Sequence, residues 1–194
     1  MGKNYEQGYV CLKQQSFALG EYTISPVQDN HIESIRLWRN AQRDVLRQKN
    51  SIEPEQQAKY FSLNVWPDMA LPHPSNILFS MFCDGKLIGY GGLVHINWSD
   101  KRAEISFLLD PSRTGDANFY ESDFSTFLRL LKEIAFRILK LHRIFTETYN
   151  IRPHHIKTLE LNGFLREGVM KDHVIISNAF VDSIIHGCLN KDEK

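Results

Sequence analysis

The sequence predicts an α+β domain, a mixed and mostly antiparallel central sheet of about seven strands with helices on both faces. Three observations predict this class. Two apolar runs flank Asp84-Gly85, the pair that most readily adopts the positive φ angles of a tight hairpin turn. A long amphipathic helix follows, and a strand at 143–149 comes almost directly after it. Two closing strands, around 169–177 and 180–188, complete the sheet.

In the first part of the domain the sequence predicts a short strand, two helices and a loop. A short strand near 21–25 leads into a helix that begins at Asn30, with Glu33 three residues later as in a capping box. A second helix is expected to begin at Pro54. Proline has no backbone N–H, and in the first turn of a helix that group would have no intrahelical partner in any case. The segment 66–75 is rich in proline, which neither a helix nor a central strand accepts, and is expected to be a loop.

The second part supplies most of the sheet. The hairpin strands and a third strand should form an antiparallel meander, over 77–83, 86–96 and 103–109. Apolar residues at helical spacing then run from Phe124 to Ile138. A shorter helix from Pro153 to Asn162 ends at Gly163, a residue suited to a left-handed cap.

Length and composition indicate a single domain. The chain has 194 residues, 42% of them hydrophobic, enough for a core without disulfide staples. We expect the domain at 21–189, a polar lead-in at 1–20 and a tail at 190–194. The 23 basic and 23 acidic residues cancel, so we expect neither a nucleic acid nor a membrane as partner.

The three cysteines, Cys11, Cys83 and Cys188, are far apart and odd in number, which argues against a disulfide framework and favours a reducing, cytoplasmic compartment. We see no signal-peptide core or membrane-spanning run. The histidines show no ligand spacing, so no metal site is expected.

The order of elements resembles the GNAT superfamily of acyl-CoA-dependent N-acyltransferases. It consists of the hairpin, the strand at 103–109, the long helix, the strand at 143–149, and a short helix that closes on Leu161-Asn162-Gly163-Phe164. The resemblance covers about 21–189 and implies acetyl-CoA as cosubstrate, with a small-molecule amine as the other partner. It leaves open whether the chain acts alone or as a homodimer.

In this superfamily the CoA pyrophosphate lies on a loop with the pattern Gln/Arg-x-x-Gly-x-Gly/Ala, where backbone N–H groups at a helix start hold the anion. The matching segment, Ser112-Arg113-Thr114-Gly115-Asp116-Ala117, keeps the glycine and the alanine but begins with serine. The resemblance therefore implies a cofactor site at Ser112, Arg113, Gly115 and Ala117, with the backbone of Leu108 and Leu109 along the pantetheine arm and Arg152 at the family's CoA-contacting asparagine. Either 115–121 is inserted or the loop is rebuilt, and an acidic cap that binds nothing is the alternative.

Glu104 is the main candidate for chemistry, because the family's glutamate on this strand removes the proton of the acceptor amine. The alternative is that Glu104 only forms a cross-strand ion pair. Glu147, on the adjoining strand, is the second carboxylate. Leu159 occupies the position of the family's tyrosine acid, so Tyr149 and His155 are the substitutes, unless His154-His155 is merely a solvated helix start. A thiolate can also leave without a protein acid.

The stretch Ile35-Arg36-Leu37-Trp38-Arg39-Asn40, with Arg43 and Gln57-Ala58-Lys59-Tyr60-Phe61, resembles the acceptor region of two sub-branches. One acetylates amino-sugar nucleotides and the other acetylates protein N-termini. An arginine fork suits phosphate and an aromatic face suits a sugar or base, which makes five residues the acceptor candidates: Trp38, Arg39, Asn40, Arg43 and Tyr60. The alternatives are a core role for Trp38 and a solvated stripe of Arg39 and Arg43.

Three functions follow from these patterns. The first choice is an acetyl-CoA-dependent N-acetyltransferase that acts on a primary amine of an amino-sugar nucleotide, with Glu104 as general base. The second is a protein N-terminal acetyltransferase of the ribosomal-protein type. The third is a GNAT-like binding module without activity, for which the altered loop and the missing tyrosine are the evidence.

Overall fold

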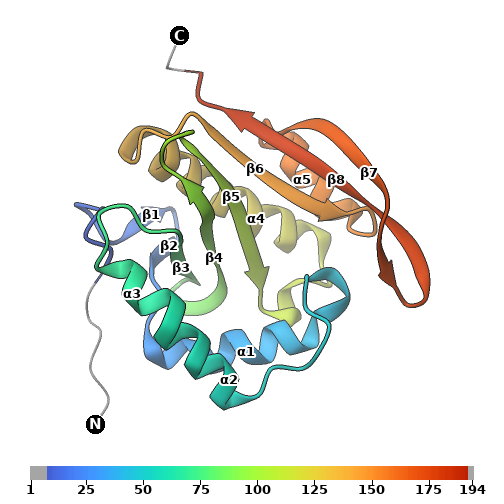
Figure 1. Cartoon of the computed structure of the whole chain (residues 1–194), viewed down its shortest axis with the longest axis horizontal. Coiled ribbons are helices and arrows are strands. Elements are labelled where there is room, and N and C mark those ends of the chain that lie inside the picture. The colour runs from blue at the N-terminus through green and yellow to red at the C-terminus, as the bar shows by residue number, and fades with distance from the viewer. Residues whose placement is uncertain (1–7, 192–194) are drawn as a thin grey trace.

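The central feature of the fold is one sheet, seen in a computed structural model that describes residues 8–191 (Figure 1). Within these residues it has eight strands in the order β1-β2-β3-β4-β5-β6-β8-β7. The strands are β1 (Phe17–Leu19), β2 (Tyr22–Pro26), β3 (Ile77–Cys83), β4 (Lys86–Asn97), β5 (Arg102–Leu109), β6 (Arg143–Tyr149), β7 (Leu165–Ile176) and β8 (Ala179–Leu189). β5 and β6 pair in parallel and the other neighbours are antiparallel. The predicted fold class is confirmed, with one strand beyond the expected set.

The predicted hairpin joins β3 to β4 at Asp84-Gly85. Both residues have positive φ angles, 48° and 74°, as a tight turn between antiparallel strands requires. The meander then continues into β5, which pairs with β4 from Gly89 opposite Leu109 to Asn97 opposite Arg102. The sequence pattern therefore located the middle of the sheet correctly.

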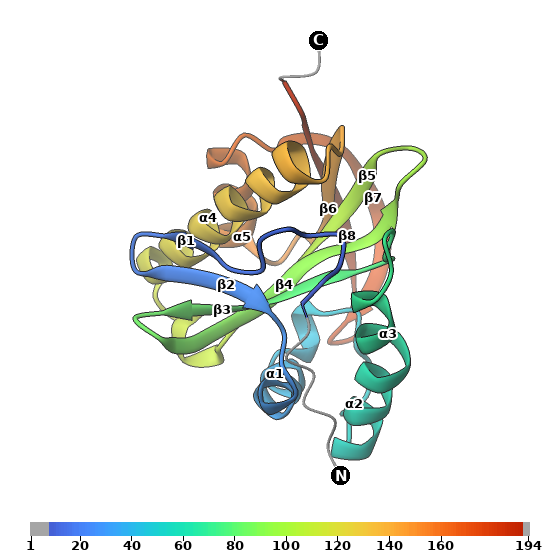
Figure 2. The ribbon, with the colours of Figure 1, turned by 90° about the vertical axis from the view of Figure 1, so that its left-hand side faces the viewer.

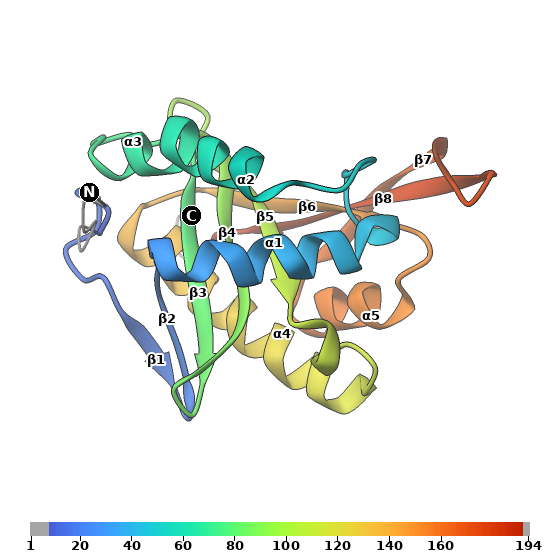
Figure 3. The same ribbon diagram turned by 90° about the horizontal axis from the view of Figure 1, so that it is seen from below.

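Helices cover both faces of the sheet. They are α1 (Ile32–Ala41), α2 (Pro54–Tyr60), α3 (Trp66–Met69), α4 (Ala117–Lys132) and α5 (Pro153–Leu161). Figure 2 shows α4 and α5 on one side of the sheet and α2 and α3 on the other. Figure 3 shows α1 passing across β3, β4 and β5. None of the helices in the described range is long and apolar enough to cross a membrane.

The expected loop at 66–75 is partly helical. α2 continues through a π-helical segment, Phe61–Val65, into α3, so the loop begins at Ala70. Pro67 is accommodated because it stands in the first turn of α3, directly after the wider π turns. Burial of Phe61 and Trp66 against the core outweighs the local signal of the prolines. The start of α1 also differs, because Glu33 bonds Arg36 instead of capping the helix.

The segment expected as a polar lead-in contributes to the fold from residue 8 onward. Tyr9 and Leu12 are buried in the core, and the Tyr9 hydroxyl accepts a hydrogen bond from the backbone N–H of Leu78 at 2.9 Å. β1 adds an edge to β2. At the other end Asn190 is buried, with its N–H bonded to His142 O. Residues 1–7 and 192–194, the remainder of the expected lead-in and tail, lie outside the described residues.

The most consequential feature for function is that β5 and β6 separate. They pair only from Arg102–Glu104 to Arg143–Phe145 and diverge toward their C-terminal ends. In open sheets that contain parallel strands, ligands bind beyond these ends at such a break. α4 packs beneath this region through Phe124 and Phe127, whose rings lie 4.4 Å and 4.8 Å from the ring of Phe107 on β5. The break thus has an apolar floor.

Candidate active site

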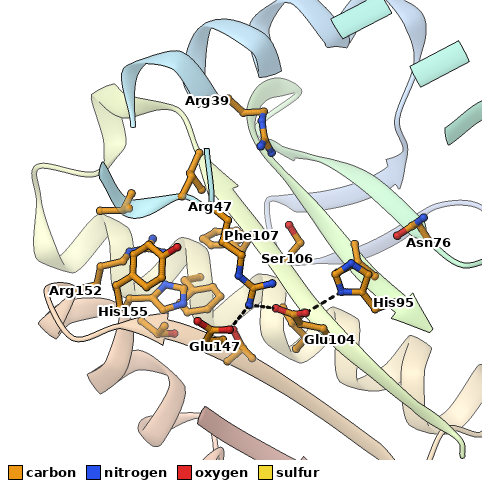
Figure 4. A pocket seen from close by; sticks show the side chains of 18 of the residues that line it. Arg39, Arg47, Asn76, His95, Glu104, Ser106, Phe107, Glu147, Arg152 and His155 are labelled. Carbon is orange, nitrogen blue, oxygen red and sulfur yellow. Dashed lines mark hydrogen bonds and ion pairs between the residues drawn. The ribbon is translucent and has the colours of Figure 1, made fainter. Parts of the chain in front are cut away.

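A cleft of about 240 Å³ opens where β5 and β6 separate (Figure 4). β5 contributes Glu104 and Ser106 to its walls, and β6 contributes Glu147 and Tyr149. His155 of α5 lines the cleft as well. The four predicted catalytic residues, Glu104, Glu147, Tyr149 and His155, are therefore brought together, although they come from three elements.

Two carboxylates in the cleft share one cation. Nη2 of Arg47 donates to Oε1 of Glu104 at 2.8 Å and to Oε2 of Glu147 at 2.7 Å. The two glutamate side chains are only 12% and 14% exposed, whereas that of Arg47 is 50% exposed. Burial opposes the charge of Arg47, but the two glutamates outweigh it and raise the pKa of the guanidinium. Glu104 does not pair only across the sheet, because Arg47 belongs to the connection between α1 and α2.

A histidine completes the surroundings of Glu104. Nδ1 of His95 lies 2.9 Å from Oε2 of Glu104. His95 has a positive φ of 51° at the point where the pairing of β4 with β5 shifts register. Bulges of this kind redirect side chains beside functional sites. Each oxygen of Glu104 therefore has its own nitrogen partner.

His155 is buried, so the expectation of a solvated helix start is wrong for this residue, although His154 is exposed. Its ring stacks on Phe124 with centroids 4.2 Å apart, and its Nδ1 lies 2.6 Å from the hydroxyl of Tyr120. Arg152 donates to the same hydroxyl at 3.1 Å. Burial and the nearby positive charge of Arg152 hold the pKa of His155 well below its ordinary value. His155 is therefore a neutral imidazole at neutral pH.

Tyr149 is the remaining candidate for a proton donor in the cleft. Burial raises the pKa of Tyr149, with Arg47 opposing the shift. The phenol is consequently protonated at neutral pH and can donate a proton.

A second cavity of about 360 Å³ adjoins the cleft. The two cavities share four lining residues: Arg39, Tyr60, Val94 and Ser106. The second cavity continues between α1, α2 and the sheet to Ile35, Phe61 and Tyr90. In Arg39 the Nε donates to Gln48 Oε1 at 3.1 Å, which leaves the outer nitrogens toward the cavities.

Comparison with known proteins identifies the family. The model of the acetyltransferase (GNAT) domain matches residues 24–185. This chain belongs to the GNAT acetyltransferase family. A probable N-acetyltransferase of Bacillus subtilis, YjcK, is 30% identical over 112 residues, a match that spans 57% of this chain and 59% of that protein.

Solved structures agree in fold. A spermidine N-acetyltransferase of Vibrio cholerae, in complex with CoA and spermine, superimposes with a TM-score of 0.76 over 89% of this chain and 97% of that one. A dodecameric structure of the Vibrio cholerae spermidine enzyme covers 91% of this chain and the whole of that chain with a TM-score of 0.70. Both are 18% identical in sequence, so they show the fold of this GNAT domain alone. The predicted resemblance is confirmed for the superfamily, and neither sub-branch is singled out.

The family's acetyl-CoA fits the break between β5 and β6. Past Glu104 the edge of β5 has no strand partner toward β6, so its backbone can pair with an extended pantetheine arm. The predicted contact at Leu109 is partly taken, because Leu109 O accepts from Gln42 Nε2 at 2.8 Å. Leu108 lies one residue before it on the same strand, and Arg152 lines both the cleft and the neighbouring cavity beside α5.

Several polar groups of the predicted phosphate loop already have partners within the protein. Arg113 forms a two-pronged ion pair with Asp123, at 2.6 Å and 2.8 Å, and the fully buried carboxylate of Asp123 also accepts from the Tyr22 hydroxyl at 2.9 Å. Ser112 N donates to Asp110 Oδ1. Asp116 caps α4 by accepting from the N–H groups of Asn118 and Phe119. The capping alternative describes this loop better than an open anion cradle.

The segment 115–121 does not separate the loop from the helix. α4 begins at Ala117, directly after Gly115 and Asp116, so residues 117–121 form the first turns of the helix. Gly115 has open space around its Cα, where a side chain would meet no atom within 4 Å. The glycine of the family pattern is present but is not required here by close packing.

Only part of the predicted acceptor set reaches the cleft. Arg39 and Tyr60 line both cavities. Trp38 packs against the core, as its alternative interpretation expected. Asn40 is structural, because it exchanges hydrogen bonds with the backbone of Ile52. Arg43 is exposed and lines a groove beside β7 rather than the cleft.

Three residues of the site were missed from the sequence: Arg47, His95 and Tyr120. Arg47 lies in a polar connection without periodicity, so no sequence signal singles it out. Tyr120 precedes Phe124 by one helical turn, and an earlier start of the predicted helix would have found it. The redirection of His95 depends on a bulge in the pairing of β4 and β5.

Proposed function

We propose that this GNAT domain transfers the acetyl group of acetyl-CoA to a primary amine of a small molecule, with Glu104 as general base. The observation that carries the proposal is the pair of largely buried carboxylates, Glu104 and Glu147, that converge on one cationic nitrogen where β5 and β6 separate. An amine is mostly protonated at neutral pH, so a site for N-acetylation must bind an ammonium group and then remove its proton.

The reaction balances with groups in the cleft. Glu104 takes one proton from the ammonium group, and the neutral amine attacks the carbonyl carbon of the acetyl group. A C–N bond forms, the C–S bond breaks, and CoA leaves as a thiolate. The nitrogen loses its second proton on forming the amide, and this proton replaces the one that Tyr149 gives to the thiolate, while Glu104 releases the first proton to solvent. Tyr149, a phenol at neutral pH, can protonate the thiolate, and neutral His155 is not suited to that step.

The finer proposal for the acceptor is an amino-sugar nucleotide. Arg39 and the half-exposed Tyr60 line both cavities, and a guanidinium group and an aromatic ring are suited to a diphosphate and a stacked ring. Besides Arg47, which pairs with the two glutamates, Arg39 and Arg152 line the cleft, and these two cations favour an amine with an anionic portion over a polyamine. The spermidine enzymes share the fold, and the charge of this cleft argues for a different acceptor.

The test is an acceptor panel measured by release of free CoA thiol from acetyl-CoA. The panel contains UDP- and dTDP-amino sugars, spermidine, and a peptide with a free N-terminus. We expect kcat/KM to be highest for an amino-sugar nucleotide. Highest activity with spermidine would overturn the finer proposal, and highest activity with the peptide would favour the N-terminal acetyltransferase. Absence of thiol release with every acceptor, together with no thermal shift by acetyl-CoA, would favour the inactive binding module.

A further inference from the structure

Arg47 occupies an unusual position in the cleft. It belongs to the connection between α1 and α2, and its side chain reaches into the cleft toward Glu104 and Glu147 (Figure 4). A single nitrogen, Nη2, donates to both Glu104 and Glu147, at 2.8 Å and 2.7 Å. The carboxylates face the cleft from two strands, so neither strand alone creates this arrangement.

The chemistry of that nitrogen is close to that of an acceptor. A primary ammonium group has three N–H donors on one nitrogen, and a guanidinium Nη has two. A nitrogen at the position of Nη2 would donate to both carboxylates, whichever of the two groups carries it. The ammonium group would have one further N–H, and Glu104 is already in contact to accept a proton.

We propose that Nη2 of Arg47 marks the binding position of the acceptor nitrogen, and that the ammonium group of the acceptor displaces Arg47 from Glu104 and Glu147. The inference rests on the proposed function and refines it. Glu147 becomes the second carboxylate that holds the ammonium group. Between turnovers the guanidinium group of Arg47 occupies the position of the ammonium group.

Exchange of one cation for another is physically favourable here. Removal of a cation from two largely buried carboxylates would leave them uncompensated, which is costly. In an exchange they are paired before and after the step. The side chain of Arg47 is half exposed, so an acceptor can approach it from solvent and Arg47 can swing away. The neighbours of Arg47 stay anchored, since Gln48 bonds Arg39 and Asn40 while Gln42 bonds Leu109 O.

The consequence is competition between Arg47 and the acceptor. Arg47→Gln removes the competitor and keeps a polar side chain. We expect the KM for the acceptor to fall by roughly tenfold, a change that corresponds to a modest ion-pair contribution, with kcat within about threefold of wild type. Lys49→Gln is the matched control, because Lys49 is an exposed cation on the same connection and outside the cleft. It should change neither parameter.

A second measurement uses guanidinium as a probe of the vacated position. Millimolar methylguanidinium should inhibit Arg47→Gln competitively with the acceptor and raise its melting temperature. Wild type should be little affected, and tetramethylammonium, which has no N–H, should affect neither protein. A KM that is unchanged or raised in Arg47→Gln, or a lack of stabilisation by methylguanidinium, would overturn the inference.

Failure of the inference and failure of the proposed function are distinguishable. If wild type transfers no acetyl group to any amine, the function fails, but stabilisation of Arg47→Gln by methylguanidinium still establishes the cation site. If wild type is active and methylguanidinium does not stabilise Arg47→Gln, the function stands and the displacement does not.

Discussion

Clusters of similar charged residues lie near the two ends of β5, but one is accessible to solvent and the other is buried. Beside the N-terminal half of β5, Glu104 and Glu147 face an open cleft and hold a half-exposed arginine. Beyond its C-terminal end, Asp123 is fully buried and holds Arg113 in a two-pronged pair within the structure. The difference teaches that the residue types of a charged cluster do not identify a site. What identifies it is whether the hydrogen-bonding groups remain accessible to a ligand.

The largest expected effect comes from a substitution in the open cleft. Glu104→Gln keeps the shape and hydrogen bonds of the side chain but loses its capacity to accept a proton. We expect kcat to fall by roughly 10²- to 10⁴-fold with little change in acetyl-CoA affinity. The defect should shrink as pH rises, because a neutral amine becomes more abundant and needs the base less.

The matched control for this variant is Glu121→Gln, which removes a partly exposed glutamate of α4 that pairs with Lys157 outside the cleft. It should keep wild-type kcat. A wild-type rate for Glu104→Gln at pH 7, or a loss that does not depend on pH, would remove Glu104 from the mechanism and leave Glu147 as the carboxylate to test.

The second effect concerns stability and comes from a substitution in the buried ion pair of Arg113 with Asp123. Asp123→Asn leaves Arg113 without its counter-charge and turns an amide NH₂ toward it. Loss of one partner of a buried pair costs about 3–5 kcal/mol, and because Arg113 is partly exposed we expect about 3 kcal/mol from urea unfolding. The kcat of the folded fraction should change less than threefold.

A double variant separates charge imbalance from lost packing. Arg113→Leu with Asp123→Leu removes both charges and should cost less than Asp123→Asn alone, since no buried charge is left unpaired. If Asp123→Asn instead raises the KM for acetyl-CoA without loss of stability, the pair serves the cosubstrate and the contrast between the two ends fails.

Acid should weaken the fold through three histidines. Burial lowers the pKa values of His31, His155 and His186. Below their ordinary pKa of about 6.5 the unfolded chain binds protons that the folded chain resists. The free energy of unfolding should therefore fall as pH decreases from 7.5 to 5, by about 1.4 kcal/mol for each pKa unit of depression within that window. Urea unfolding at several pH values measures it.

The control for the acid effect is exposed His154, for which His154→Gln should leave the pH dependence unchanged. His155→Gln should flatten it, whatever its cost at neutral pH. A free energy of unfolding that stays constant between pH 7.5 and 5 would contradict the assignment of neutral, buried histidines.

Local chemistry made much of the fold predictable. Asp84-Gly85 specifies its turn through backbone conformation, whereas Glu104 on β5 was singled out by the resemblance to the GNAT family and not by a local pattern. Sequence did not reveal that His155 would be covered, because its burial depends on α4 packing Phe124 and Tyr120 against α5. A polar helix start and a buried ring stack have the same local sequence.

The site was less predictable than the fold for the same reason. Arg47, one of the two partners of Glu104, is 57 residues away in the chain, and no neighbouring pattern marks it. The ion pair between Arg113 and Asp123 likewise becomes evident only from the three-dimensional arrangement of the loop and α4. Sequence identified the carboxylates, whereas the three-dimensional structure decides which cations they meet.

The smallest effect sharpens the comparison at the start of α4. Asp116 accepts from the N–H groups of Asn118 and Phe119, the type of donor that a phosphate at a helix start would use. Asp116→Ala should cost about 1 kcal/mol of stability through loss of the cap. It also frees both N–H groups and removes a negative charge, so acetyl-CoA affinity, measured by calorimetry, should rise by roughly threefold to tenfold if the phosphates bind here.

Asp116→Asn resolves charge from capping, because asparagine is an equally good cap without the charge. It should keep the stability of wild type and gain only the electrostatic part of the affinity. If both variants bind acetyl-CoA as wild type does, the phosphates are held away from this helix start. Arg152, which lines the cavity beside α5, would then be the cation to test for phosphate binding. The loop at 112–117 would then not open to bind the phosphates.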